Sequence, residues 1–287
     1  MKKFLVTGST GATGAPTVRL LLENGHKVIA FVHREDDRSK ALKELGAEIV
    51  PGDMLKIEDV RGAMKGVEGA YFCYPLTQGA VEATAIFAQA AHEHNVKQIV
   101  YMSHRQSRPH ARSPATINHW LSEQILDRSG VPTAHLRVNF FSEWMLYTAS
   151  EIRAGRYLTP FDPESRFAPI AAVDIARVIV KILENPDAFG SKVIPVTGAR
   201  EVSHIELAGI LATTLGKEVR FEQVTPDEFV KIMGWDGDPS FAMHFKAIKV
   251  DQQEQLLVGV DSSAAEIVGQ PLTTPEQFIQ QHHHLLA

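Results

Sequence analysis

A glycine-spaced turn near the start of the chain constrains the fold more than any other feature. Gly8, Gly11 and Gly14 stand in "TGSTGATG", directly after the apolar run "FLV" and before the apolar helical segment "APTVRLLLEN". The turn also carries the hydroxyl groups of Ser9, Thr10 and Thr13. Small residues at this spacing let the backbone approach a pyrophosphate, whose charge is attracted to the free amides at a helix N-terminus. Because a second apolar run follows the helix, the order of elements favours a dinucleotide site over an empty turn.

The first half of the chain alternates apolar runs with helical segments. The runs are nearly continuous, which is typical of parallel strands covered on both faces. They cover residues 4–6, 27–33, 47–50, 69–74, 97–102 and 132–138. The helical segments between them are Ala15–Asn24, Arg38–Leu45, Ile57–Met64, Val81–His94 and Pro114–Ser129. This alternation predicts the α/β class, with a doubly wound parallel Rossmann sheet.

After about residue 140 the rhythm of the chain changes. We expect a helix near 140–154, an amphipathic helix over 173–185, and further short strands and helices, one of them opened by the capping pair Ser203 and Glu206. The sequence therefore predicts a nucleotide-binding domain over 1–150, to which part of 170–200 returns. Residues 151–287 are predicted to form a smaller α/β lobe that caps the carboxyl edge of the sheet.

Composition narrows the class of protein. The net charge of −5 argues against nucleic acid as a partner, and the single cysteine, Cys73, fits a reducing compartment. The N-terminus lacks the core of a signal peptide, and no stretch reaches the ~18 apolar residues of a membrane helix. Consecutive histidines at 282–284 cannot share a helix face, so we predict no metal site. We expect a cytoplasmic monomer or homodimer.

The end of the second predicted strand bears on which dinucleotide binds. His33 and Arg34 stand where an NAD-binding fold usually places a carboxylate, and Arg38 follows one helical turn later. A guanidinium pairs well with a 2′-phosphate, which favours NADP(H), with NAD(H) as the alternative cofactor. Glu35 and Asp36 follow closely, and the arginines have the alternative of being ordinary surface residues.

These features together resemble the NmrA-like branch of the atypical short-chain dehydrogenase/reductase superfamily. The likeness rests on "TGSTGATG", "GAEIVPGD", "VYMS", "SGVPTAHLRVNFF", "FAPIAAVDIA" and "VTPDEF", in that order. The resemblance implies an NADP-binding Rossmann domain with a smaller lobe, and either a reductase of quinones, azo dyes or triphenylmethane dyes or a non-catalytic sensor of NADP(H). It also implies positions around the cofactor: Asp53 and Met54 against the adenine, Tyr74 and Pro75 in the cleft, and Val138, Asn139 and Phe140 near the nicotinamide.

The chain departs from the superfamily at the Tyr-x-x-x-Lys pair, which supplies the proton in carbonyl reduction. Counted back from "SGVPTAHLR", the tyrosine position is Ala115 and the lysine position is His119. Helical periodicity places Ile117, Leu121, Gln124, Ile125 and Arg128 on one face, which we expect to pack on the core, and His119 with Glu123 on the opposite face. We expect His119 to face either solvent or the cleft, where it would orient the nicotinamide ribose or donate a proton. Ser103, at the end of strand five, is a further expected cofactor contact.

Aromatic residues after the sixth strand suggest where an acceptor would bind. Phe141, Trp144 and Met145 follow the expected nicotinamide site and are candidates for an apolar substrate wall, with ordinary core packing as the alternative. The favoured hypothesis is an NADPH-binding oxidoreductase that transfers hydride to a small conjugated acceptor such as a quinone or azo compound. The alternative is an NADP(H)-sensing regulator that binds a protein partner. An epimerase-like enzyme would need the missing Tyr-Lys pair.

Overall fold

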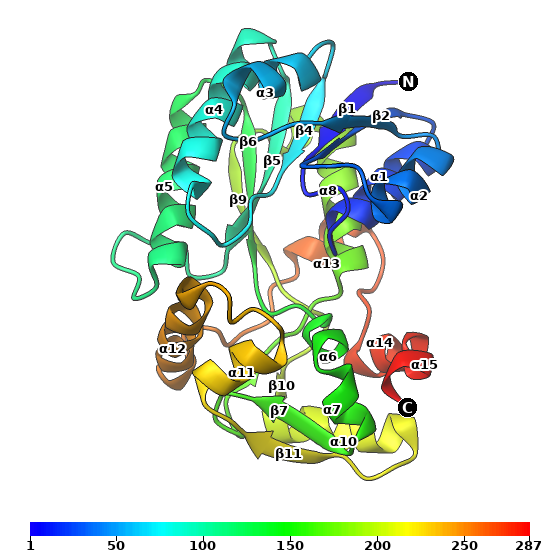
Figure 1. Ribbon diagram of the computed structural model, residues 1–287, viewed down its shortest axis with the longest axis vertical. Helices are drawn as coiled ribbons and strands as arrows, with labels where there is room; N and C mark the ends of the chain where they lie inside the picture. The colour runs from blue at the N-terminus through cyan, green and yellow to red at the C-terminus, as the bar shows by residue number, and fades with distance from the viewer.

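A seven-stranded sheet organises the upper half of the molecule in Figure 1. The computed structural model describes residues 1–287. All the strands are parallel and run in the order β3-β2-β1-β4-β5-β6-β9. They are β1 (Lys3–Val6), β2 (Lys27–Val32), β3 (Glu48–Pro51), β4 (Gly69–Phe72), β5 (Gln98–His104), β6 (Thr133–Val138) and β9 (Lys192–Val196). The predicted doubly wound α/β fold is confirmed.

Helices cover both faces of this sheet, so each face has a separate apolar core (Figure 1). One layer consists of α3 (Ile57–Ala63), α4 (Ala80–Glu93) and α5 (Pro114–Arg128). The other consists of α1 (Gly14–Glu23), α2 (Asp37–Glu44), α8 (Ala172–Glu184) and α13 (Ser263–Val268). The predicted stops at Gly25, Gly46 and Gly130 all have positive φ, the backbone conformation in which glycine ends a helix.

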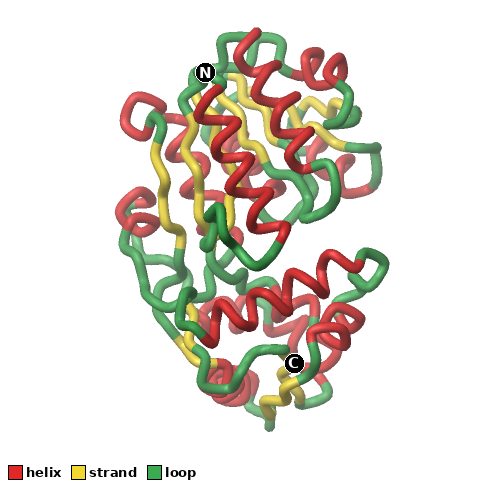
Figure 2. Tube along the Cα trace, turned by 90° about the vertical axis from the view of Figure 1, so that its left-hand side faces the viewer, coloured by secondary structure: helices red, strands yellow, loops and turns green.

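The smaller lobe lies below the carboxyl ends of the strands (Figures 1 and 2). It contains a parallel pair, β7 (Arg156–Thr159) with β11 (Arg220–Gln223), and an antiparallel pair, β8 (Arg166–Phe167) with β10 (Val202–Ser203). Its helices are α6 (Trp144–Tyr147), α7 (Ala149–Arg153), α10 (His204–Leu215), α11 (Pro226–Ile232), α12 (Pro239–Gln253), α14 (Pro275–Gln281) and α15 (His283–Leu286). The predicted capping box of Ser203 with Glu206 opens α10. The lobe therefore has its own aromatic-rich core.

The chain crosses between the two halves several times. After leaving the sheet at β6 it returns as α8, the short helix α9 (Pro186–Phe189) and β9, and it returns again as α13 on α8. We keep the division into a 1–150 domain and a 151–287 lobe as a proposal, with these returning segments assigned to the sheet.

The predicted helix near 140–154 is wrong in its first part. Residues just after β6 stay extended, because Phe140 and Ser142 exchange backbone hydrogen bonds with Ile170: Ile170 N–H donates to the Phe140 carbonyl and Ser142 N–H to the Ile170 carbonyl, each at 2.9 Å. Only then do the two short helices α6 and α7 begin. Tertiary pairing thus overrides the local helical pattern and holds the β6 exit in place over the sheet edge.

Candidate functional site

A cleft of about 420 Å³ lies between the carboxyl edge of the sheet and the lobe. The loops after β1, β4, β5 and β6 form its upper wall, and α6 and α12 contribute its lower wall. Twelve of the residues predicted for the site line it: Gly8, Gly11, Thr13, Tyr74, Pro75, Ser103, His119, Val138, Asn139, Phe140, Phe141 and Trp144. Ligands bind at this edge in open α/β sheets, and these residues from separate loops meet there.

The glycine turn forms a cradle that only glycine permits. Gly8 has φ of +56°, and a Cβ at Gly14 would lie 2.1 Å from the carbonyl oxygen of Gly8. Thr13 stands at the N-cap of α1 but gives no side-chain cap, and the amides of Ala12, Thr13 and Gly14 have no acceptor within the protein. Free amides at a helix N-terminus are the groups that hold a pyrophosphate, so the turn fits a dinucleotide.

Two hydroxyl groups of this turn point into the protein and form hydrogen bonds there. The Ser9 hydroxyl donates to the carbonyl of Phe31 at 3.1 Å, and the Thr13 hydroxyl shares a 2.8 Å hydrogen bond with that of Tyr71. Both residues are buried, whereas Thr10 is half-buried. Ser9 and Thr13 therefore tie the turn to β2 and β4, which keeps the amides of the turn in position.

The basic residues after β2 differ in whether their side chains already have a partner within the protein. His33, Arg34 and Arg38 are all exposed and stand outside the cleft lining. Arg38 is engaged with the Asp36 carboxylate, at 2.9 Å from Nε and 2.6 Å from Nη2. Arg34 has no hydrogen bond or ion pair, so its guanidinium is the one available to an incoming phosphate.

The predicted adenine residues lie beside the cleft rather than in it. Backbone N–H of Asp53 donates to the Asp59 carboxylate, and Leu55 N–H donates to the Asp53 carboxylate, each at 2.9 Å. Met54 packs on the core between the sheet and α3–α4.

Tyr74 lines the cleft close to Asp53. Burial first, and then the nearby Asp53 carboxylate, raise the pKa of the Tyr74 hydroxyl.

His119 faces the cleft, one of its two predicted locations. Its Nδ1 shares a 2.8 Å hydrogen bond with the Tyr101 hydroxyl, and its ring stacks near that of His104, with ring centroids 6.0 Å apart. Burial, with a smaller contribution from His244, lowers the pKa of His119 to about 4. The imidazole is neutral at pH 7, so it is suited to positioning a ligand and poorly suited to supplying a proton.

The predicted apolar face of α5 is wrong. The buried residues of this helix are Thr116, Ser122, Glu123 and Leu126. Glu123 is buried because the Ser103 hydroxyl donates to its carboxylate at 2.5 Å and Arg137 donates to both its oxygens, at 3.0 and 2.7 Å. An ion pair with complete hydrogen bonding replaces apolar packing at this position, so hydrophobic periodicity could not locate the face.

An aromatic wall forms the other end of the cleft. Trp144 packs on Phe245 and Tyr147 on Trp235, with ring centroids 5.4 and 5.3 Å apart, and Phe241 continues the row. Sequence reasoning predicted Trp144 and Phe141 but missed Trp235, Phe241 and His244, which come from the α11–α12 region. No local motif marks these three residues, because only the fold of the lobe brings them to the cleft.

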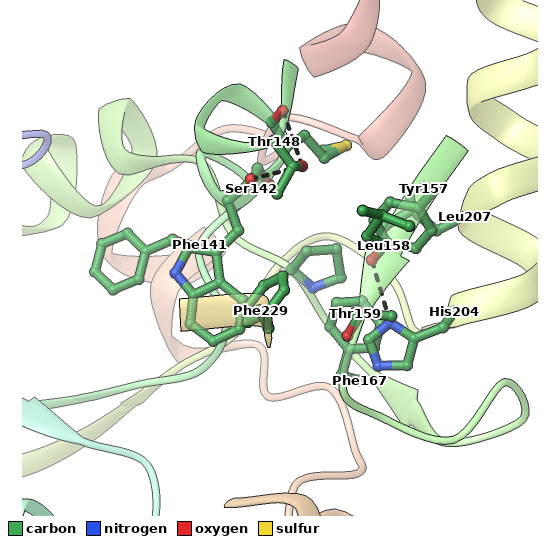
Figure 3. Close-up of a pocket in the computed structure, with 13 residues that line it drawn as sticks. Phe141, Ser142, Thr148, Tyr157, Leu158, Thr159, Phe167, His204, Leu207 and Phe229 are labelled. Carbon is green, nitrogen blue, oxygen red and sulfur yellow. Dashed lines mark hydrogen bonds between the residues drawn. The ribbon is translucent and has the colours of Figure 1, made fainter. Parts of the chain in front are cut away.

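Met145 was predicted to line the cleft, but it lies inside the smaller lobe, behind the aromatic wall. It is buried in the lobe and lines an internal cavity of about 20 Å³, shown in Figure 3. Phe141 and Trp144 line both spaces and separate them. In the cavity wall the Tyr157 hydroxyl and His204 Nδ1 share a 3.1 Å hydrogen bond (Figure 3).

The loop after β5 joins the sheet to the lobe through charged groups. Arg108 and Arg112 both donate to one oxygen of the buried Asp251 carboxylate on α12, at 2.9 and 2.8 Å. The side chain of Gln106 donates to the carbonyl of Leu256, and the Ser113 hydroxyl lies 2.8 Å from His244 Nδ1. These contacts fix α12, and with it the lower wall of the cleft, against the domain that carries the glycine turn.

A parallel sheet with a glycine turn after β1 and a cleft across its carboxyl edge defines a Rossmann-type dinucleotide-binding protein. No group of three His, Cys, Asp or Glu side chains is arranged to hold a metal ion. The chain belongs to the NmrA-like family, whose model matches residues 1–278. None of its helices combines the length and apolar character that a membrane crossing requires.

Relatives of the chain include enzymes and a regulator. An NAD(P)H azoreductase from Xenophilus azovorans is 29% identical over 283 residues, covering 97% of each chain. The NADPH complex of quinone oxidoreductase QOR2 from Escherichia coli is 20% identical with a TM-score of 0.83, covering 97% of this chain and 99% of that one. The transcriptional regulator NmrA in complex with NADP is 17% identical with a TM-score of 0.80, covering 99% and 96%. The two solved structures share the fold.

Proposed function

We propose that this protein binds NADP(H) and transfers hydride from NADPH to a small conjugated acceptor such as a quinone or an azo compound. One observation carries the proposal: a single cleft runs from the glycine turn to the aromatic wall around Trp144 and Trp235. The turn suits a pyrophosphate and the wall suits a flat ring system, so cofactor and acceptor would share one cleft. The similarity to an azoreductase over nearly the whole chain supports an oxidoreductase in general.

Each group has a role in this proposal. The amides of Ala12, Thr13 and Gly14 hold the bridging phosphates, and Arg34 meets the 2′-phosphate of NADP(H). NADPH, when bound, supplies the hydride. His119, held by Tyr101, positions the nicotinamide ribose, while the aromatic wall stacks the acceptor and excludes water. A cytoplasmic site of action is part of the proposal, since Cys73 is a free thiol.

Steady-state NADPH oxidation with a panel of quinones and azo dyes tests the proposal. Calorimetric titration with NADPH, NADP⁺ and NADH establishes cofactor binding separately. We expect tight NADPH binding and turnover with at least one acceptor class. Tight binding without turnover across the panel would contradict the reductase and leave the cofactor site standing.

A second candidate is an NADP(H)-sensing regulator. The observation that favours it is the absence of the Tyr-x-x-x-Lys pair, whose positions hold Ala115 and His119. In this case NADP⁺ and NADPH would change the affinity for a protein partner, and no acceptor would be reduced. Comparing partner capture or oligomeric state with each cofactor, alongside the turnover panel, separates the two candidates.

A further inference from the structure

Glu143 is an acidic residue in the cleft wall that sequence reasoning did not identify. It follows the β6 exit directly and stands at the N-cap position of α6, between Phe141 and Trp144 in the cleft lining. Its Oε1 accepts the backbone N–H of Ala172, the first residue of α8, at 2.9 Å. The carboxyl group is therefore fixed at the point where the expected nicotinamide site meets the aromatic wall.

The other oxygen of this carboxyl group lacks a partner. Glu143 Oε2 is buried and has no hydrogen bond within the protein, and among the buried side-chain atoms in that condition it alone belongs to a cleft-lining residue. A buried oxygen without a donor is costly as part of a carboxylate and far less so when it carries a proton. The geometry therefore favours a neutral carboxyl group at the cleft.

The charged neighbours of Glu143 act in the same direction. Burial raises the pKa of Glu143 to about 7, against the smaller lowering effect of its hydrogen bonds with the backbone of Ala172 and of Glu143 itself, and the Asp174 carboxylate on α8 adds a minor increase. The Asp174 carboxylate accepts hydrogen bonds from Arg177 and from the backbone N–H of Thr273, each at 2.7 Å. Both donors are therefore engaged by Asp174 and not by Glu143. On α6, burial and then Glu143 raise the pKa of Tyr147, which leaves that phenol neutral.

The histidines of the cleft are poorly suited to donating a proton at neutral pH. Burial lowers the pKa of His119 and of His244 to about 4, and it lowers that of His104 well below the ordinary value. All three imidazoles are neutral at pH 7 and release a proton only with great difficulty. A carboxyl group that is half-protonated near neutral pH is matched to proton transfer under those conditions.

We propose that Glu143 is the proton donor of this site, an inference that rests on the reductase function proposed above. For a quinone, the cofactor's hydride adds two electrons and one hydrogen to the acceptor. The carboxyl proton of Glu143 goes to the carbonyl oxygen, a step in which the side chain turns its buried Oε2 into the cleft. The cofactor is oxidised, the quinone becomes the hydroquinone, and the carboxylate recovers a proton from water. For an azo compound the same proton goes to nitrogen, which gives the hydrazo product.

Direct titration of the carboxyl group is the first test. Infrared difference spectra of the cofactor-free protein should show a protonated-carboxyl band that disappears as the pH rises through about 7. The band should be absent in Glu143→Gln and retained in Glu164→Gln, which makes the same change at an exposed position. Glutamine keeps an oxygen for the Ala172 N–H, so the start of α8 keeps its cap. A band unaffected by Glu143→Gln would overturn the assignment.

The second test compares pH profiles of turnover. In the wild type, quinone or azo reduction should fall as the pH rises above about 7, because the donor loses its proton. Glu143→Gln should lower kcat by about 100-fold and remove that decline, and Glu143→Asp should restore part of both. NADPH affinity, measured by calorimetry, should change by less than about threefold.

Three outcomes would count against the proposal. Unchanged kcat and pH profile in Glu143→Gln would overturn the proton-donor role and leave the reductase in place. Loss of NADPH affinity in that variant would mean that the carboxyl group binds the cofactor instead. No turnover by the wild type with any acceptor would overturn the reductase and the proton donor together.

Discussion

The hydroxyl of Tyr101 and Nδ1 of His119 lie 2.8 Å apart, so a hydrogen bond joins the fifth strand of the sheet to α5 at the side of the cleft. Tyr101 is 4% exposed and packs on Phe72, with ring centroids 5.5 Å apart, which fixes the hydroxyl. The imidazole is thereby held against the sheet by a group that cannot move independently.

Removing this hydroxyl should weaken cofactor binding. Tyr101→Phe loses a hydrogen bond worth about 0.5–1.5 kcal/mol, and His119→Ala loses the ring itself, so we expect NADPH dissociation constants to rise by about 3-fold and about 10-fold. Calorimetric titration measures both. Tyr157→Phe is the matched control, because it removes a similar bond to His204 inside the lobe. An equal effect of the control would mean that the loss reflects general stability.

The glycine cradle should tolerate no side chain. In Gly14→Ala the new Cβ would meet the carbonyl oxygen of Gly8, so the turn must open and the amides lose their common direction. We expect NADPH binding to fall by at least about 100-fold, measured by fluorescence or calorimetry. Gly62→Ala, in α3 with no atom near the new methyl group, should stabilise the protein by about 0.5–1 kcal/mol and leave binding unchanged. Retained affinity in Gly14→Ala would rule out the assigned phosphate site.

Arginine substitutions should separate the two cofactors. Arg34→Ala removes a guanidinium that has no partner in the protein, so we expect NADPH affinity to fall by about 10- to 100-fold while NADH affinity changes little. Arg38→Ala should have a smaller effect, since that side chain is already engaged with Asp36. Parallel titrations of both variants with both cofactors provide the measurement. Equal losses for NADPH and NADH would contradict the 2′-phosphate assignment.

The contact between the β5 loop and α12 should depend on one buried charge. Asp251→Asn leaves Arg108 and Arg112 without their shared carboxylate, and we expect a loss of about 1.5–3 kcal/mol in unfolding free energy. Glu254→Gln removes only an exposed partner of Arg112 and should cost about 0–1 kcal/mol. Urea denaturation followed by fluorescence compares the two. Similar costs for both variants would show that the buried carboxylate has no special role.

Stability should fall in mild acid. Burial in the folded protein lowers the pKa of His119 and of His244 from the ordinary value of 6.5 to about 4. The folded state therefore binds fewer protons than the unfolded chain, so this stability is complete above pH 6.5 and is lost as the pH falls toward 4. Each histidine contributes up to about 1.4 kcal/mol per pH unit. Thermal melts between pH 4 and 7 provide the measurement. The melting temperature should fall less steeply with decreasing pH in His244→Gln than in the exposed control His92→Gln.

Local patterns in the sequence account for the sheet and for the glycine turn. Continuous apolar runs identified the strands that β1 to β6 form, because parallel strands buried on both faces need little else. The cradle was also predictable, since Gly8 has a positive φ that favours glycine and Gly14 leaves no room for a side chain. In both cases the determining contacts lie close in the sequence.

The rest of the site depends on contacts between distant segments. Glu123 is buried because Arg137 and Ser103 surround it, and nothing in the periodicity of α5 reveals those partners. Trp235 and His244 follow β6 by about a hundred residues, and only the folding of the smaller lobe brings them to the cleft. Glu143 looked like an ordinary polar residue among aromatics, and its unpartnered oxygen appears only once Ala172 is placed beside it.

The repeated crossing of the chain between its two halves has a consequence for fragments. A truncated protein ending at residue 150 would lack β9, α8 and α13, leaving β6 as a bare sheet edge and one apolar face of the sheet partly uncovered. Such a fragment should aggregate instead of serving as a minimal cofactor-binding module. Gene fusions and insertions are better placed in surface turns within each half, where they leave the interleaved segments continuous.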